Sequence, residues 1–237
     1  MSFLGHYKQS IKSIRSRYPK LYNLAVVIVC RVYRHFSLKT MVRGKRNIIR
    51  AERVLFKNCS IKIEGDCNTV AIGSESFLCN TVIKISGSGH QIAIGEKTKL
   101  FDTVLWMEDQ KNLIEIGADT SINGAHIAVT EPNHRISIGE NCLFSSEIDI
   151  RNGDSHSIID IDTNQRINYA RDIIIGNHVW VGKYAKIIKG AHIEDDCVIG
   201  IGSLINSRIY RNTLAVGIPS RIVRQNITWD HKRIYDQ

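Results

Sequence analysis

The chain has 237 residues, of which 43% are hydrophobic, and it contains only three prolines. Its formal net charge of +9 is unevenly spread: residues 1–57 hold 14 Lys and Arg against one acid, whereas the other 180 residues hold 18 bases and 22 acids. A mildly acidic body excludes a protein that binds nucleic acid over its whole surface. The basic first quarter predicts a segment that meets something anionic.

The first segment, residues 4–36, has the spacing of an amphipathic helix. Apolar side chains recur every three or four residues, at Leu4, Tyr7, Ile11, Ile14, Tyr18, Leu21, Ala25, Ile28 and Val32. Pro19 predicts two helices that meet near Tyr18, with the proline in the first turn of the second. Two roles remain open for this arm: a cap over the end of the next domain, or a basic helix that contacts an anionic membrane through residues 1–36. Its longest apolar run, residues 24–30, is too short to span a bilayer.

The middle of the chain is repetitive. Ile-Gly pairs begin at residues 72, 94, 116 and 138, a constant spacing of 22. From residue 175 the period becomes six, with large aliphatics at Ile175, Val181, Ile187, Ile193, Ile199 and Ile205. Small residues sit four places after the first five of these, at Val179, Ala185, Ala191, Cys197 and Ser203.

A period of six is incompatible with an amphipathic helix. It predicts short strands joined by tight turns, with Gly and Asn at the corners and aliphatic side chains stacked inward along a continuous solenoid. About seven coils, spaced by about 4.8 Å, would make a prism about 35 Å long. Cys142 and Cys197 fall at core positions and are expected to be buried thiols.

A histidine near the end of the 22-residue regime is the first candidate for chemistry. The spacing places Asn68, His90, Asn112, His134 and His156 in one register. One interpretation is a ladder of turn residues with His156 as its last member, since Asn and His tolerate left-handed backbone geometry. The other is a functional histidine, because a polar stretch follows it and interrupts the coils.

The repeats resemble a known family. The run "IIIGNHVWVGKYAKIIKGAHIEDDCVIGIGSLI" and the later "AVGIPSRIV" resemble the hexapeptide-repeat acyltransferases, and most closely the bacterial O-acetyltransferases of capsular polysaccharides and exopolysaccharides. The resemblance covers about residues 60–225. It implies a left-handed parallel β-helix, a hand that ordinary crossover rules would not predict, and a homotrimer with active sites between the prisms.

The resemblance also implies site residues. His156 would be the general base that takes the proton from an alcohol and returns it to a thiolate, and Asp154 or a backbone carbonyl would fix its ring. Trp180 would form a wall at the reacting end, or else pack on a neighbouring subunit. Lys183 would supply a backbone N–H to the oxyanion.

The same resemblance implies a site for acetyl-CoA, the expected co-substrate. The residues concerned are Gly182, Gly200, Gly202, Ser203, Gly217, Arg221 and Arg224. Ile201 departs from the usual Ala and would narrow the groove for the pantetheine arm. The two arginines would pair with the 3′-phosphate, or remain solvated at the surface. No metal is expected: His134, His156 and His178 are evenly spaced, but the change of period between them removes them from one register.

We therefore expect an all-β solenoid, a left-handed parallel β-helix with a short N-terminal α-helical segment. Its parts would be a basic amphipathic helical arm at 1–44, the acyltransferase domain at 45–210 and a segment near the acetyl-CoA site at 211–237. The predicted function is acetyl transfer from acetyl-CoA to a sugar hydroxyl of a surface polysaccharide by direct attack. Transfer to a small free acceptor, such as a nucleotide-sugar amine or serine, and a non-catalytic scaffold are the alternatives.

The expected location is the cytoplasm, because the six cysteines show no C-x-x-C pairing and no secretory signal precedes them. Contact with the inner membrane through residues 1–36 would make the protein peripheral to that membrane. No nucleic-acid partner is expected. The sequence does not identify the sugar, the hydroxyl or the polymer.

Overall fold

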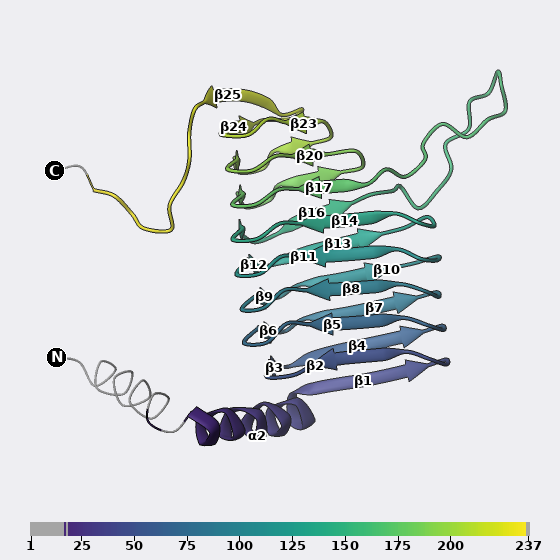
Figure 1. Cartoon of the computed structure of the whole chain (residues 1–237). Helices are drawn as coiled ribbons and strands as arrows, with labels where there is room; N and C mark the ends of the chain where they lie inside the picture. The colour runs from purple at the N-terminus through teal and green to yellow at the C-terminus, as the bar shows by residue number, and fades with distance from the viewer. Residues whose placement is uncertain (1–16, 18, 236–237) are drawn as a thin grey trace.

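The computed structural model describes residue 17 and residues 19–235, and it shows a three-sided parallel β-solenoid with one α-helix, α2 (Pro19–Ser37) (Figure 1). Sheet A contains β1 (Leu38–Arg43), β4 (Cys59–Glu64), β7 (Val82–Ser86), β10 (Val104–Met107), β13 (Ala125–Val129), β16 (Ile148–Arg151), β19 (Lys186–Ile188) and β22 (Leu204–Ile205). Sheet B contains β2 (Ile48–Ala51), β5 (Thr69–Ile72), β8 (Gln91–Ile94), β11 (Leu113–Ile116), β14 (Arg135–Ile138), β17 (Ile173–Ile175), β20 (His192–Ile193) and β23 (Arg208–Ile209). Sheet C contains β3 (Leu55–Lys57), β6 (Phe77–Cys79), β9 (Lys99–Phe101), β12 (Ser121–Asn123), β15 (Leu143–Phe144), β18 (Trp180–Val181), β21 (Val198–Ile199), β24 (Thr213–Val216) and β25 (Arg221–Gln225). The predicted parallel β-helix with a short N-terminal helix is confirmed.

The repeat periods seen in the sequence are the strand registers of the solenoid. Ile92 pairs with Ile114, Ile114 with Ile136, and Ile136 with Ile173, and all four side chains are buried. Burial of one such aliphatic side chain contributes about 1.5–3 kcal/mol, and the stack repeats on every face. Cys142 and Cys197 are buried as expected, and burial raises the pKa of the Cys142 thiol to about 11.

The corners of the prism are less restricted in residue type than predicted. We name each corner after the sheets that it connects: A–B, B–C and C–A. At the B–C corner one residue per coil has φ between 53° and 64°, and these are Arg53, Glu75, Lys97, Asp119, Asn141, His178, Asp196 and Asn212. Hydrogen bonds between coils offset the cost of this geometry; for example, the Lys97 N–H donates to the Ser74 carbonyl at 2.9 Å. Gly and Asn are therefore not required there.

The predicted ladder of turn residues exists at the A–B corner, but it does not include His156. The side chains of Asn68, His90 and Asn112 each accept the backbone N–H of the residue 22 places later. The ladder ends at His134, whose Nδ1 lies 2.9 Å from a carboxylate oxygen of Asp172. The next coil has 15 extra residues, because β14 pairs with β17 at an offset of 37 instead of 22, so His156 is displaced from the register.

The ends of the solenoid differ from the predicted boundaries. β1 pairs with β4 along its whole length, so the strands begin at Leu38, within the predicted arm at 1–44. Each of sheets A and B has eight strands, one coil more than the expected seven. β24 continues sheet C beyond residue 210, and β25 folds back on it as the single antiparallel pair of the named strands.

Helix α2 begins at Pro19, as expected for the second helix of the arm, whereas the first predicted helix lies outside the described residues. α2 lies across the end of the prism against β1 and β3, and Cys30 is the most buried of its described side chains. No helix in the described part of the chain is long and apolar enough to cross a membrane.

Candidate functional site

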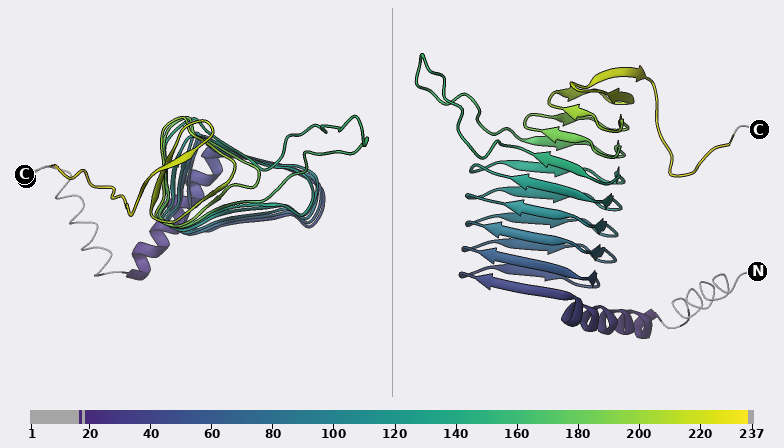
Figure 2. Two further views of the ribbon diagram at one scale, coloured as in Figure 1. Left: turned by 90° about the horizontal axis from the view of Figure 1, so that it is seen from above. Right: turned by 180° about the vertical axis from the view of Figure 1, so that it is seen from behind.

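His156 lies on an irregular segment, residues 152–172, which connects β16 to β17 at the A–B corner. This segment projects from the prism as a long loop, on the side away from the C-terminal tail (Figure 2). Its outer half is a hairpin closed by the Asp160 N–H to the Gln165 carbonyl and the Ile167 N–H to the Ile158 carbonyl, both at 2.9 Å. The side chain of His156 is exposed, and its ring nitrogens have no hydrogen-bond partner among the described residues.

Asn168 holds the two arms of this loop together. Its side-chain amide donates to a carboxylate oxygen of Asp154 at 2.8 Å and to the His156 carbonyl at 2.7 Å. Its side-chain oxygen accepts the Ile158 N–H at 2.7 Å and Nε of Arg166 at 3.1 Å. The side chain is buried, with 6% of the residue exposed. Asn168 therefore fixes the backbone on both sides of His156.

Two ion pairs join this clamp to the regular coils. Lys189, which directly follows β19, donates to the Asp154 carboxylate and, at 3.2 Å, to the Asn168 carbonyl. Arg166 pairs with Glu131 of the coil below. The hydrogen bond from Lys189 is the main reason that the pKa of Asp154 lies below its ordinary value. In this structure the Asp154 carboxylate thus anchors the loop, and its predicted contact with the His156 ring is absent.

The predicted acetyl-CoA residues of the coils lie along one edge of the prism, the C–A corner. The Gly202 N–H donates to the Lys183 carbonyl at 2.8 Å, and the Gly217 N–H donates to Oγ of the buried Ser203 at 3.2 Å. The Lys183 N–H has no hydrogen-bond partner among the described residues, whereas the N–H groups on either side of it, those of Gly182 and Tyr184, donate to carbonyls of other coils. That free donor is at the position expected to face an oxyanion.

Space along this edge is limited by side chains of the next coil. A Cβ added to Gly200 would lie 2.5 Å from Cγ1 of Val216, so only glycine allows the close approach. The side chain of Ile201 is largely exposed beside it. Arg221 and Arg224 lie on β25 just beyond, exposed and without a carboxylate partner in the described part of the chain. This edge of the prism is thus apolar beside Gly200 and basic beyond it, on β25.

Trp180 begins β18 at the B–C corner and has an aromatic neighbour within its own chain. Its ring centroid lies 6.2 Å from that of Trp229. Trp229 stacks on His178 at 4.3 Å and donates its indole N–H to the His178 carbonyl at 2.7 Å. Trp229 was not predicted from the sequence; the one signal is an isolated tryptophan in the polar C-terminal tail.

The structure does not bring all the predicted residues together within one chain. His156 lies on the loop at the A–B corner, whereas Trp180 begins β18 of sheet C and Lys183 follows in the turn after that strand, with the glycines at the C–A corner. A metal site is also not assembled. No group of three or more His, Cys, Asp and Glu suited to a metal occurs among the described residues, since His134 and His178 lie at different corners.

One histidine–aspartate pair lies outside the predicted set of site residues. Nδ1 of His126, on β13, is 3.6 Å from a carboxylate oxygen of Asp149 on β16, beside a pocket of about 430 Å³ near the C–A corner. His126 Nδ1 is buried and lacks a hydrogen bond. This pair is a rival for the catalytic base, and its signal in the sequence is only the offset of 23 between two strand residues.

Comparison with known proteins agrees with this geometry. Residues 172–207 match the model of the bacterial transferase hexapeptide, six repeats. This part of the chain thus carries hexapeptide repeats. A polysialic acid O-acetyltransferase of Escherichia coli O1:K1 / APEC is 32% identical over 106 residues, which cover 45% of this chain and 34% of that protein. One of Neisseria meningitidis is 33% identical over 107 residues, 43% of this chain and 50% of that protein.

Solved structures extend the likeness along the solenoid. The polysialic acid O-acetyltransferase OatWY has a TM-score of 0.79 at 28% identity, over 84% of this chain and 94% of that one. The polySia-specific acetyltransferase NeuO has a TM-score of 0.76 at 26% identity, over 85% and 93%. In sequence, the matched region spans only about a third to a half of the length of the curated relatives. The hexapeptide-repeat chain is therefore similar to acetyltransferases over nearly the whole of its fold.

Proposed function

We propose that this hexapeptide-repeat protein is an acetyl-CoA-dependent O-acetyltransferase that modifies a sugar hydroxyl of a surface polysaccharide. The observation that carries the proposal is the exposed, unpartnered imidazole of His156 on a clamped loop, in the coil that precedes the matched repeats. Polysialic acid is the first acceptor to test, because the relatives similar to this chain are named for it. The non-catalytic alternative would not require this clamp.

The residues present suit the chemistry. Acetyl-CoA supplies the activated thioester. An imidazole can both accept and donate a proton, so His156 can take the proton of the attacking hydroxyl and return it to the leaving thiolate. The free Lys183 N–H can stabilise the oxyanion of the tetrahedral intermediate. Arg221 and Arg224, which lack carboxylate partners, suit the phosphates at the far end of the co-substrate.

A complete site requires a second subunit. We infer a homotrimer in which the loop of one prism meets the C–A edge of its neighbour, since these edges face apart within one chain. The direct transfer mechanism follows if the base, the thioester and the hydroxyl meet there at once. Ser155 and Ser157, next to His156 in sequence, are then not needed as nucleophiles.

Mixed trimers test this shared site. Co-expressed His156→Ala and Trp180→Ala chains are expected to regain activity, because one of the three interfaces in a mixed trimer has both residues intact. Recovery should approach about one third of the wild-type rate per mixed trimer. Activity no higher than that of the two separate variants would place the whole site within one chain.

The activity itself is tested by two measurements on the full chain. Release of free thiol from acetyl-CoA, dependent on added acceptor, is expected from the transferase. Mass spectrometry of polysialic acid and of other purified capsular glycans should show a gain of one acetyl group per modified hydroxyl. Acetylation of nucleotide-sugar amines or serine, but not of glycans, would support the small-acceptor alternative. If no acceptor causes release of thiol, the result would support the alternative of a non-catalytic scaffold.

Trp180→Ala and Arg221→Ala should affect different kinetic constants. Loss of the Trp180 wall is expected to lower kcat with little change in the KM for acetyl-CoA, because it lies at the reacting end of the cleft. Arg221→Ala is expected to raise that KM with a modest change in kcat. If Trp180→Ala leaves kcat unchanged but the trimer dissociates, measured by light scattering, Trp180 is an interface residue instead.

We also propose a cytoplasmic location for the enzyme. All six cysteines are free, and four of them are buried, as is typical of proteins in a reducing compartment. Peripheral contact of the N-terminal arm with the inner membrane would bring the enzyme to a polymer that is destined for the surface.

A further inference from the structure

Among the described residues, helix α2 buries Cys30 against the first coil and leaves an apolar face uncovered. Cys30 points at the first coil and is only 6% exposed. Leu24, Ile28, Val32 and Phe36 follow one another at four-residue intervals, and they are 57%, 52%, 50% and 82% exposed. Since 100° of rotation separates successive helical residues, Ile28 and Val32 lie nearly opposite Cys30. The prism thus does not bury these four side chains, which we call the apolar stripe.

Basic residues accompany the apolar stripe. Of the described residues up to 57, Glu52 is the sole acid, whereas 11 are Lys or Arg. The rest of the chain is mildly acidic, so the charge is concentrated at the end of the prism that α2 covers (Figure 1). A helix with an apolar face and basic flanks is the pattern of proteins that lie in an anionic membrane interface.

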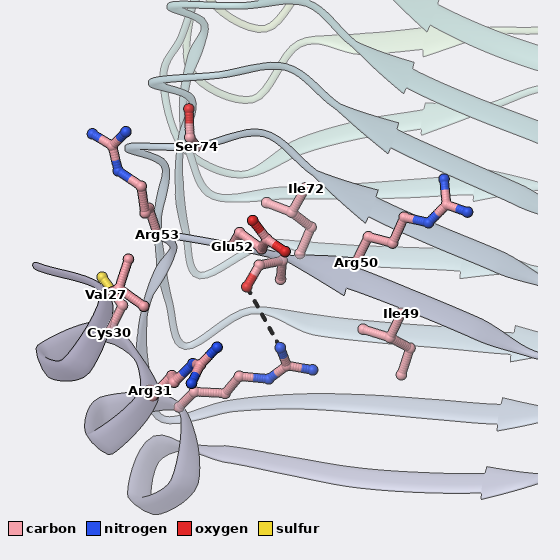
Figure 3. A pocket seen from close by; sticks show the side chains of 11 residues that line it. Val27, Cys30, Arg31, Ile49, Arg50, Glu52, Arg53, Ile72 and Ser74 are labelled. Atoms are coloured by element: carbon pink, nitrogen blue, oxygen red, sulfur yellow. Dashed lines mark hydrogen bonds between the residues drawn. The ribbon is translucent and has the colours of Figure 1, made fainter. Parts of the chain in front are cut away.

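A basic pocket opens beside the same helix. It has a volume of about 520 Å³ and lies between α2 and the first coils, with Arg31 and Arg34 from the helix and Arg50 and Arg53 from the first coil in its lining (Figure 3). The guanidinium groups of Arg31 and Arg50 form no hydrogen bond or ion pair with any described residue. Nε of Arg53 is buried and also without a partner, although its guanidinium pairs with Glu75 at 2.7 Å. Guanidinium groups recognise phosphate oxygens through paired N–H donors.

We propose that this end of the prism docks on an anionic phospholipid bilayer, with the apolar stripe in the interface and a lipid phosphate in the arginine pocket. The stripe supplies apolar area and the pocket supplies free N–H donors, and α2 contributes to both of them. Figure 3 places Glu52 among the arginines, where its negative charge opposes an anion. The docking surface is at the opposite end of the solenoid from the acetyl-CoA edge, so it does not depend on the proposed reaction.

Cosedimentation of the full chain with vesicles tests the proposal. Binding is expected to vesicles of phosphatidylcholine with 30% phosphatidylglycerol and not to phosphatidylcholine alone, at 0.05 M salt. Each basic residue near an anionic surface contributes about 1 kcal/mol, so Arg31→Gln and Arg50→Gln should each weaken binding about fivefold. Glu52→Gln should strengthen it. Lys99→Gln, an exposed lysine on β9 outside the pocket, is the matched control and should have no effect.

The stripe is tested separately with Ile28→Gln/Val32→Gln, which changes exposed side chains and should leave the circular dichroism spectrum unaltered. Vesicle binding should fall at least tenfold, while thiol release with a soluble acceptor is retained. Equal binding to neutral and anionic vesicles, or no binding at all, overturns the proposal. So does a change in oligomeric mass, since the stripe would then be a contact between copies. A raised KM for an anionic glycan in the arginine variants, without vesicle binding, would assign the pocket to the acceptor.

Discussion

His156→Ala is expected to lower kcat at least about a hundredfold while the protein stays folded. One positioned acid–base group contributes about 10²–10⁴ to a rate, and a hundredfold loss corresponds to about 2.7 kcal/mol of transition-state stabilisation. The side chain is exposed and contributes no packing, so the melting temperature should be unchanged. The KM for acetyl-CoA should also be unchanged, because the co-substrate is assigned to the C–A edge. Added imidazole should restore part of the rate, since the cavity left by the ring is open to solvent.

Substitutions of two other histidines are the controls for this prediction. His134→Ala removes a residue of the corner ladder and its contact with Asp172, so it should lower stability slightly and kcat by a few-fold at most. His126→Ala tests the rival pair with Asp149. If His126→Ala abolishes turnover and His156→Ala does not, the base belongs to the pocket near the C–A corner. Equal losses for His134→Ala and His156→Ala would remove the special role of His156.

Asn168→Ala is expected to lower kcat by about ten- to a hundredfold through the position of His156. The substitution deletes the four side-chain hydrogen bonds of the buried Asn168, among them the one that accepts the Ile158 N–H, at a cost of about 1–3 kcal/mol. The loop can then shift, and a displacement of about 1 Å in a catalytic group can cost about a hundredfold in rate. We therefore regard Asn168 as a positioning residue that acts through His156.

Three measurements distinguish positioning from general destabilisation. In Asn168→Ala the KM for acetyl-CoA should stay constant while kcat falls, and imidazole should not rescue the rate because a base is already present. Amide hydrogen exchange should increase within residues 152–172 and not in the coils. Gln165→Ala, on the exposed tip of the same loop, is the matched control and should keep nearly full activity. A uniform rise in exchange along the solenoid would mean that Asn168 is merely structural.

Much of the architecture was predictable because the repeat periods are a direct record of it. A spacing of 22 or six residues places like side chains above one another, and parallel pairing of short strands is the arrangement that buries them together. The buried thiols of Cys142 and Cys197 followed from the same rule. The position of the first strand could not be predicted from that rule, because β1 belongs to the coil before the clear repeats and most of its residues are exposed.

The site was predictable only in part. His156, Trp180, Lys183 and the glycines were named from a resemblance, which gives residue identities and not their positions in space. The hydrogen bonds that Asn168 and Lys189 make to Asp154, and Arg166 to Glu131, join residues 14 to 35 positions apart, and no local pattern marks such contacts. The sequence placed His156 in the register of the corner ladder, whereas the 15 inserted residues moved it onto a projecting loop.

The sequence by itself determined the solenoid, the buried face of each strand and the single basic end. These features follow from the spacing and charge of residues, which can be read without knowing which distant residues are in contact. The tertiary structure decided which residues meet: it paired Asp154 with Lys189, placed Trp229 against His178, and left the apolar stripe of α2 exposed. Those outcomes depend on which face of a helix or loop finds a partner in another coil, and only the folded chain, with all its surfaces competing for burial and hydrogen bonds, settles that.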